Sequence, residues 1–281
     1  MSDPATPNVW GRAVTRFADT TGDGNAAGFK STTGGFAFGL DGKMAPDIDL
    51  GVAFGYFRTD VDARGNGGST DTDTDSYAVA AYGNYSTGDL FADGSLSYAL
   101  SDYDSRRPIR FGGMDRTADG SSQGHGFGAA LAVGYTWRTQ GAIVEPAASV
   151  RYDRISRNGF SESGAQSLGL AVGDMTMDTV RTGLGIRAAK RYDLGGMVAE
   201  PEVRVRWDHD FLDRAADSRV ALAGVPFQVS GTEAGRDAAV LGTGFVAYLE
   251  NSLEGFAGYD VELRDGSSAH RVSAGLRYRL P

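Results

Sequence analysis

The chain has 281 residues, with 41 glycines, no cysteine and a formal net charge of −9. The lack of cysteine excludes disulfides and thiolate metal sites, and the acidic balance excludes nucleic acid as a partner, because phosphates attract basic surfaces. No apolar run approaches the roughly 20 residues that a membrane-spanning helix needs.

Large apolar residues alternate with small or polar ones along most of the chain. The first clear segment, IDLGVAFGY at 48–56, has an apolar side chain at every second position, with Asp, Gly or Ala between them. FGAALAVGYTW at 127–137, TVRTGLGIRA at 179–188 and VSAGLRYRLP at 272–281 repeat the pattern. Successive side chains of a strand point to opposite faces, so this period of two predicts β-strands with one apolar face.

Two kinds of connection separate these segments, and they alternate along the chain. Short turns are expected at 41–47, 86–89, 138–141, 193–196 and 251–254. Longer polar loops are expected at about 18–28, 60–74, 104–121, 156–176 and 212–235, with a shorter one near 265–268. The alternation predicts twelve antiparallel strands in an up-and-down meander, with both termini on the short-turn side.

The face opposite the apolar one carries Gly, Ala and Ser, and then charges of both signs. A soluble β-sandwich would instead place its large apolar residues in a closed core. Small residues and mixed charges fit the water-filled lumen of a closed barrel, whose apolar face contacts lipid. The polar residues expected to face the lumen are Glu145, Arg151, Arg181, Arg187, Glu200, Glu202, Arg204, Arg206, Arg277 and Arg279.

Aromatic residues gather near the expected strand ends. Trp and Tyr concentrate at the two membrane interfaces of such barrels. The expected interface aromatics are Trp10, Trp137, Tyr152 and Trp207. Lipid cannot satisfy free backbone groups, so the final strand must pair with the first. The sequence therefore predicts one closed, antiparallel, twelve-stranded transmembrane β-barrel over residues 8–281, preceded by a residual linker at 1–7.

The order and spacing of these segments resemble the C-terminal translocator, or β, domain of classical type V autotransporters of Gram-negative bacteria. The similarity runs from residue 8 to the end of the chain. The segments that carry it are NVWGRAVTRF (8–17), GGFAFGLDG (34–42), DLGVAFGYFRTDVD (49–62), YAVAAYGNYSTGDLFADGSLSYALSDYD (77–104), VEPAASVRYDRISRNGFSESGA (144–165), EPEVRVRWDHDF (200–211), GYDVEL (258–263) and HRVSAGLRYRL (270–280).

The resemblance implies an anchor in the outer membrane that takes part in moving an N-terminal passenger to the cell surface. It implies a monomer without catalysis or cofactor. The expected partners are outer-membrane lipid, the barrel-assembly machinery, and the chain's own passenger with its linker helix, both absent from this sequence. Only seven residues precede Asn8, so an excised domain is expected. The charged inner face would either stiffen the barrel or hold the linker helix or extended chain.

The terminal strand of this family is the signal that the assembly machinery reads. The resemblance places that signal on Val272, Leu276, Tyr278 and Leu280. The chain departs from the family pattern here, because Leu280 stands where Phe or Trp is usual and Pro281 follows it.

Two other functions compete with this interpretation. A stand-alone, porin-like channel for small solutes is the alternative, although twelve strands enclose a narrower lumen than the 16 to 18 of porins. A hydrolase would need a positioned base, and the DHD run at 208–210 is the only suggestive cluster. On a regular strand Asp208 and Asp210 point away from His209 and cannot orient it.

A calcium site is also considered and set aside. Asp71, Asp73 and Asp75 have the spacing of the first three ligands in a calcium loop. However, Ser76 and Tyr82 occupy the positions that require Gly and Glu. An acidic surface loop is therefore expected.

Overall fold

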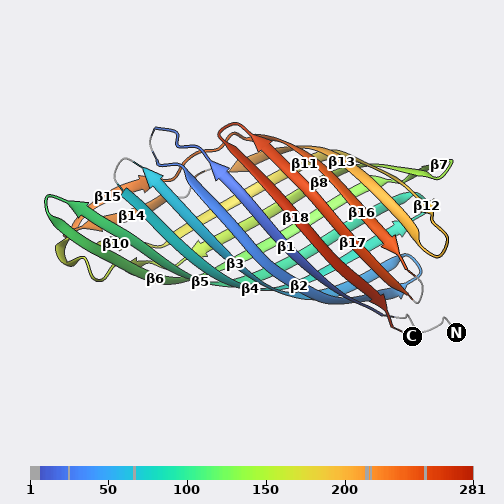
Figure 1. Cartoon of the computed structure of the whole chain (residues 1–281), viewed down its shortest axis with the longest axis horizontal. Coiled ribbons are helices and arrows are strands. Elements are labelled where there is room, and N and C mark those ends of the chain that lie inside the picture. Colours follow the sequence, from blue (N-terminus) through green and yellow to red (C-terminus); the bar gives the residue numbers. More distant parts are fainter. Residues whose placement is uncertain are drawn as a thin grey trace.

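The computed structural model describes residues 7–280, apart from 25, 66–67, 213–214, 216 and 250–251. Residues 1–6 of the expected linker, and Pro281, lie outside the described residues. The described chain is almost entirely β-strand, and its strands, tilted against the long axis, form a long cylinder (Figure 1). Among the described residues, no helix is long and apolar enough to cross a membrane.

Twelve long strands form the wall of the cylinder. They are β1 (Asn8–Thr20), β2 (Phe29–Ala45), β3 (Ile48–Gly65), β4 (Gly68–Thr87), β5 (Leu90–Phe111), β6 (Met114–Tyr135), β8 (Ala142–Arg157), β11 (Met175–Lys190), β13 (Val198–Leu212), β16 (Asp237–Tyr248), β17 (Leu253–Arg264) and β18 (Ser267–Arg279). Each strand pairs antiparallel with its neighbours along the chain. The short strands β7 (Trp137–Thr139) and β12 (Tyr192–Asp193) extend two of the turns.

The last strand closes the cylinder on the first. β18 pairs with β1 from Asn8 opposite Arg279 to Thr20 opposite Ser267. β8 pairs with both β6 and β11, so the ring has no free edge there either. The predicted closed, twelve-stranded meander is therefore confirmed. The start of β1 and the end of β18 lie at the end with the short turns, which we call the turn end (Figure 1).

Two of the predicted loops are wrong, because the strands continue through them. β3 and β4 remain paired as far as Gly65 opposite Gly68. β5 and β6 remain paired as far as Phe111 opposite Met114, where Gly112 and Gly113 turn with φ of 55° and 83°. Polar residues at 60–74 and 104–121 belong to strands that extend beyond the apolar band into water, and two glycines suffice to join β5 to β6. These hairpins define the other end of the molecule, the hairpin end.

The expected acidic loop belongs to one of these hairpins. Asp71, Asp73 and Asp75 lie on β4, where alternation places them on one face. Arg58 on β3 contacts two of them, at 3.2 Å from Asp73 and 3.8 Å from Asp75. The run is therefore a charged strand face and not a loop.

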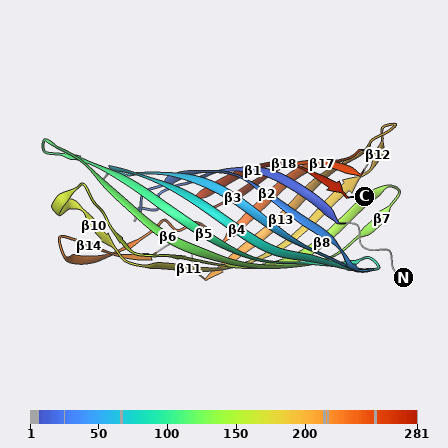
Figure 2. The ribbon, with the colours of Figure 1, turned by 90° about the horizontal axis from the view of Figure 1, so that it is seen from below.

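A second, smaller sheet lies at the hairpin end, beside the barrel (Figure 2). It consists of β9 (Phe160–Ser161), β10 (Leu170–Val172), β14 (Asp217–Leu222) and β15 (Val225–Ser230). The turn of 3-10 helix η1 (Gln166–Leu168) joins β9 to β10. Nearby, Ile109, Ala118 and Ala165 are buried against Leu168 and form a small apolar core.

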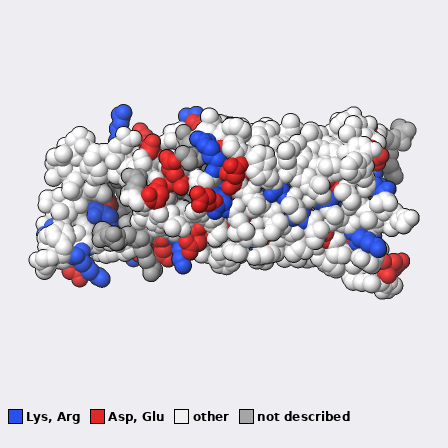
Figure 3. Space-filling model, turned by 90° about the horizontal axis from the view of Figure 1, so that it is seen from above, with Lys and Arg blue, Asp and Glu red and all other residues white. Residues whose placement is uncertain are grey.

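The outer surface of the barrel carries an apolar band. Leu96, Leu184 and Val205 lie more than half exposed on strand centres. Figure 3 shows most charged side chains of this face in the half towards the hairpin end, a few at the turn end, and a mostly uncharged zone between them. The large apolar residues therefore face outwards, as predicted for a barrel surrounded by lipid.

A buried carboxylate holds the loop between β8 and β11 against the β5–β6 hairpin. Arg107 Nε and Nη2 donate to the Glu162 carboxylate at 3.1 and 2.5 Å, and the backbone N–H of Leu170 donates to it at 2.8 Å. Only 7% of the Glu162 side chain is exposed.

Glu162→Gln is expected to loosen this loop without changing the barrel. Hydrogen bonds that involve a charge are stronger than neutral ones, so amide hydrogen exchange over residues 160–172 should accelerate roughly tenfold. The matched control is Asp115→Asn, because Asp115 pairs with Arg110 at 3.2 Å on the same hairpin and both side chains are more than 70% exposed. Equal exchange in the two variants would contradict the prediction.

Candidate functional site: the barrel lumen

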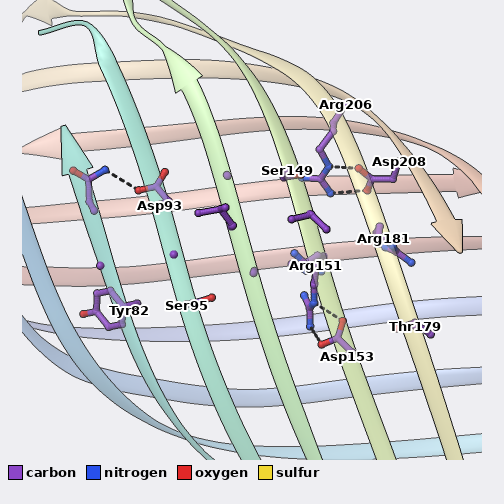
Figure 4. Close-up of a pocket in the computed structure, with 18 of the residues that line it drawn as sticks. Tyr82, Asp93, Ser95, Ser149, Arg151, Asp153, Thr179, Arg181, Arg206 and Asp208 are labelled. Carbon is purple, nitrogen blue, oxygen red and sulfur yellow. Dashed lines mark hydrogen bonds and ion pairs between the residues drawn. The ribbon is translucent and has the colours of Figure 1, made fainter. Parts of the chain in front are cut away.

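The barrel encloses a polar cavity of about 1240 Å³. Because side chains alternate along each strand, every second side chain points into the cavity. Figure 4 shows inward side chains from several strands, among them Tyr82, Ser95, Arg151, Arg181 and Arg206. Lumen-facing polar residues are therefore contributed from both sides of the cavity.

The two sides of the wall differ in character. Inward positions at the centres of β3–β6 are small and neutral, for example Ala53, Ala80, Ser97 and Gly128. Inward positions on β8, β11, β13, β17, β18 and β1 are rich in arginine and carboxylates. The lumen thus has one smooth wall and one charged wall.

Near the turn end, one arginine connects three strands. Arg187 on β11 donates from Nη1 to Glu145 of β8 at 2.8 Å. Its Nη2 donates to Glu200 at 2.7 Å and its Nε to Glu202 at 2.5 Å, both on β13. Only 4% of the Glu200 side chain and 10% of the Glu202 side chain are exposed. Arg187 therefore bridges three carboxylates at once.

Two further arginines extend this cluster. Arg191 contacts Glu200 at 2.6 Å, and Arg204 contacts Glu202 and, at 2.9 Å, Asp260 of β17. Because charged pairs in a confined space fix the side chains that form them, the cluster stiffens this end of the barrel.

A second cluster lies nearer the hairpin end. Arg181 donates to Asp210 at 2.6 and 3.0 Å and to Glu262 at 3.3 Å. Arg264 contacts the same two carboxylates at 2.6 and 2.7 Å. Arg206 and Arg151 pair within their own strands, at 2.6 Å from Asp208 and 2.5 Å from Asp153.

Sequence reasoning missed most of the acidic members of these clusters. Asp153, Asp208, Asp210 and Asp260 all share the strand parity of a predicted lumenal arginine or lie directly opposite an inward residue. This shared parity is the sequence signal that could have identified them as lumenal residues. Which carboxylate pairs with which arginine depends on the registers of several strands, and the sequence alone does not indicate these registers.

Trp10 is a correction, because it points into the lumen and not into the membrane interface. Its indole N–H donates to Tyr82 Oη at 2.5 Å, and Tyr82 donates to Asp41 at 2.9 Å. The ring fills space above Gly39, where a Cβ atom would lie 2.7 Å from it. On β1 Val9 and every second residue after it face outwards, so Trp10 belongs to the series that faces the lumen.

The other expected interface aromatics lie on the outer surface. Trp137 and Trp207 are about half exposed. Tyr152 is partly buried and donates to Asp178 at 2.5 Å.

The terminal strand presents two different faces. Val272, Leu276 and Tyr278 are exposed on the outside, and the backbone N–H of Leu280 donates to Pro7 O at 3.0 Å. Arg277 and Arg279 line the lumen, where Arg277 donates to Asp41 at 2.6 Å.

The DHD run has the geometry expected of a regular strand. His209 Nδ1 lies 2.9 Å from Asp237 Oδ1, whereas Asp208 and Asp210 pair with lumenal arginines on the opposite face. This confirms that neither aspartate can orient the imidazole. Within the described residues, no group of three or more His, Asp or Glu side chains could hold a metal ion.

Comparison with known proteins agrees with this architecture. The family described as Autotransporter beta-domain matches residues 9–260. An extracellular serine protease of Serratia marcescens is 23% identical over 274 residues, which is 97% of this chain and 26% of the protease. The chain thus spans about a quarter of the length of that relative.

Two solved structures share the fold. The translocator domain of the autotransporter NalP from Neisseria meningitidis superposes with a TM-score of 0.77 at 19% identity, covering 98% of this chain and 89% of that one. The β-domain of the Bordetella autotransporter BrkA superposes with a TM-score of 0.70 at 22% identity, covering 98% of this chain and 100% of that one. The chain therefore belongs to the autotransporter β-domain family, and it is the translocator β-barrel of an outer-membrane autotransporter.

Proposed function

We propose that the lumen holds the passenger's linker, as a helix or an extended chain, while the passenger crosses the outer membrane. The observation that carries this proposal is the water-accessible cavity of about 1240 Å³ with one smooth and one charged wall. The charged clusters keep that cavity open, because their side chains bind each other along the wall instead of extending across it. Residues 1–7 then connect the barrel, residues 8–281, to the linker.

The barrel works as a monomer in this proposal. Its wall closes on itself, and the outward residues form an apolar band over the whole ring. Lipid covers such a surface without a second copy.

Assembly depends on the terminal strand. Val272, Leu276 and Tyr278 lie side by side on the outer face of β18, which is the face available to an insertion machine before the ring closes. In this proposal the barrel-assembly machinery recognises these three residues and Leu280.

A secretion assay tests the proposed function. A small reporter is fused in front of residue 1, behind a secretory leader, and its appearance on the cell surface is measured with an external protease. Secretion should require the barrel and should fail when residues 272–281 are deleted, because β1 and β17 then lose their partner. A barrel that inserts and conducts ions but never displays the reporter would favour the stand-alone channel.

A further inference from the structure

Among the described residues, several lumenal arginines have no carboxylate partner; Arg279 is one, and three others lie together on one strand pair. Arg12, Arg16 and Arg271 belong to β1 and β18, the two strands whose pairing closes the barrel. We call them the seam arginines. Within the described residues no carboxylate lies within ion-pair distance of any of the three, and the only side-chain partner recorded for them is Ser273, to which Arg12 Nη2 donates at 2.7 Å. The arginines of both lumenal clusters, in contrast, each contact at least one carboxylate.

The strand register places two of these charges face to face. Arg16 lies directly opposite Arg271 across the β1–β18 pair, and like charges in that position repel. On its other side Arg271 lies opposite Asp260, but that carboxylate binds Arg204 at 2.9 Å. Glu262 is likewise occupied by Arg181 and Arg264. The seam therefore carries guanidinium groups that no carboxylate of the described residues binds directly.

These guanidinium groups are accessible from the lumen. Arg271 lines the cavity, and Arg12 and Arg271 are both exposed residues. A guanidinium group offers several N–H donors in a planar fork that matches a carboxylate. The smooth wall of β3–β6 leaves room for an occupant beside them.

We propose that the seam arginines bind carboxylate side chains of the polypeptide that passes through the lumen. This inference rests on the proposed function, and it names the chemistry by which the barrel recognises its occupant. Acidic segments of the polypeptide therefore stay bound to the seam arginines for longer, whereas basic segments are repelled by these guanidinium groups.

Blocking of single-channel current provides the test. The refolded chain is inserted into planar bilayers and exposed to two peptides of equal length, one of alternating Glu and Ser and one of alternating Lys and Ser. Both peptides are measured at both voltage polarities, so that the applied field does not decide the result. The variant is Arg16→Gln with Arg271→Gln, which breaks no ion pair within the described residues.

The matched control is Lys30→Gln with Arg58→Gln. It removes the same two charges from exposed side chains that pair with Asp19 and Asp73 at the hairpin end. We expect the Glu peptide to block longer than the Lys peptide in the unchanged barrel. The seam variant should shorten the Glu-peptide block roughly threefold to tenfold, as expected for the loss of two solvated ion pairs, and the control should not.

Equal blocking by the two peptides, or an unchanged Glu-peptide block in the seam variant, would overturn the inference. A seam variant that changes only the preference for chloride over potassium would also overturn it, because the seam would then attract small ions only. The secretion assay separates the two proposals. If the reporter reaches the surface but the blocks do not depend on the seam, only this inference fails. If the unchanged barrel never displays the reporter, the proposed function fails.

Discussion

Arg187→Leu is expected to lower the free energy of unfolding of the barrel by roughly 2–3 kcal/mol, since three carboxylates lose their shared cation and one is left without an arginine, while lumenal water offsets part of the cost. The substitution removes the cation that Glu145, Glu200 and Glu202 share across β8, β11 and β13. Glu200 and Glu202 keep Arg191 and Arg204, but among the described residues Glu145 keeps only the hydroxyl of Thr136 at 3.0 Å. Urea unfolding in lipid vesicles, followed by tryptophan fluorescence, measures the change.

Two comparisons identify the cause of this loss. Adding Glu145→Gln to Arg187→Leu should restore part of the stability, because the carboxylate that is left without an arginine is removed. Arg58→Leu deletes an arginine that is half exposed at the hairpin end and should leave the unfolding midpoint unchanged. If Arg58→Leu and Arg187→Leu shifted the midpoint equally, the lumenal cluster would not be the source of the effect.

Leu184→Arg is expected to be about as damaging, for a different reason. Leu184 is 58% exposed on the outer face of β11, within the apolar band. An arginine on the lipid-facing side near the middle of a bilayer costs about 2–4 kcal/mol, because lipid cannot solvate the charge. The same unfolding measurement in vesicles should show this loss.

The position of the charge, and not the charge itself, should decide the outcome. Ser95→Arg places a guanidinium group in the lumen, where Ser95 lines the cavity, and should be tolerated. Leu184→Ala keeps the outer face apolar and should cost less than Leu184→Arg. A destabilising Ser95→Arg together with a harmless Leu184→Arg would reverse the assignment of inner and outer faces.

Much of the fold could be predicted from the sequence because side-chain alternation is a local property. Strands with large apolar residues on one face only, such as 48–56 and 127–137, allow few architectures in which that face avoids water. The lumenal parity of Arg187 and Arg277 follows from the same rule. The expectation for Trp10 rests on its place at a strand end and not on this rule, because Trp10 shares the lumenal parity of Arg12 and Arg16.

The loops show a second limit. Polarity at 60–74 and 104–121 signals contact with water, which a loop and a protruding hairpin share, so composition cannot distinguish them. The backbone pairing from β3 to β4 and from β5 to β6 decides it. The small sheet of β9, β10, β14 and β15 joins strands far apart in the sequence and had no local signal.

By itself, the sequence determined which residues share a face of each strand, and from this the apolar exterior, the polar interior and the need for closure. Only the tertiary structure decided how the interior charges combine. Arg181 meets Asp210 and Glu262, and Arg16 meets Arg271, because the tilt and register of the closed ring bring those particular positions together. Register is a property of the whole ring, since each strand is positioned by both of its neighbours, and no single segment encodes it.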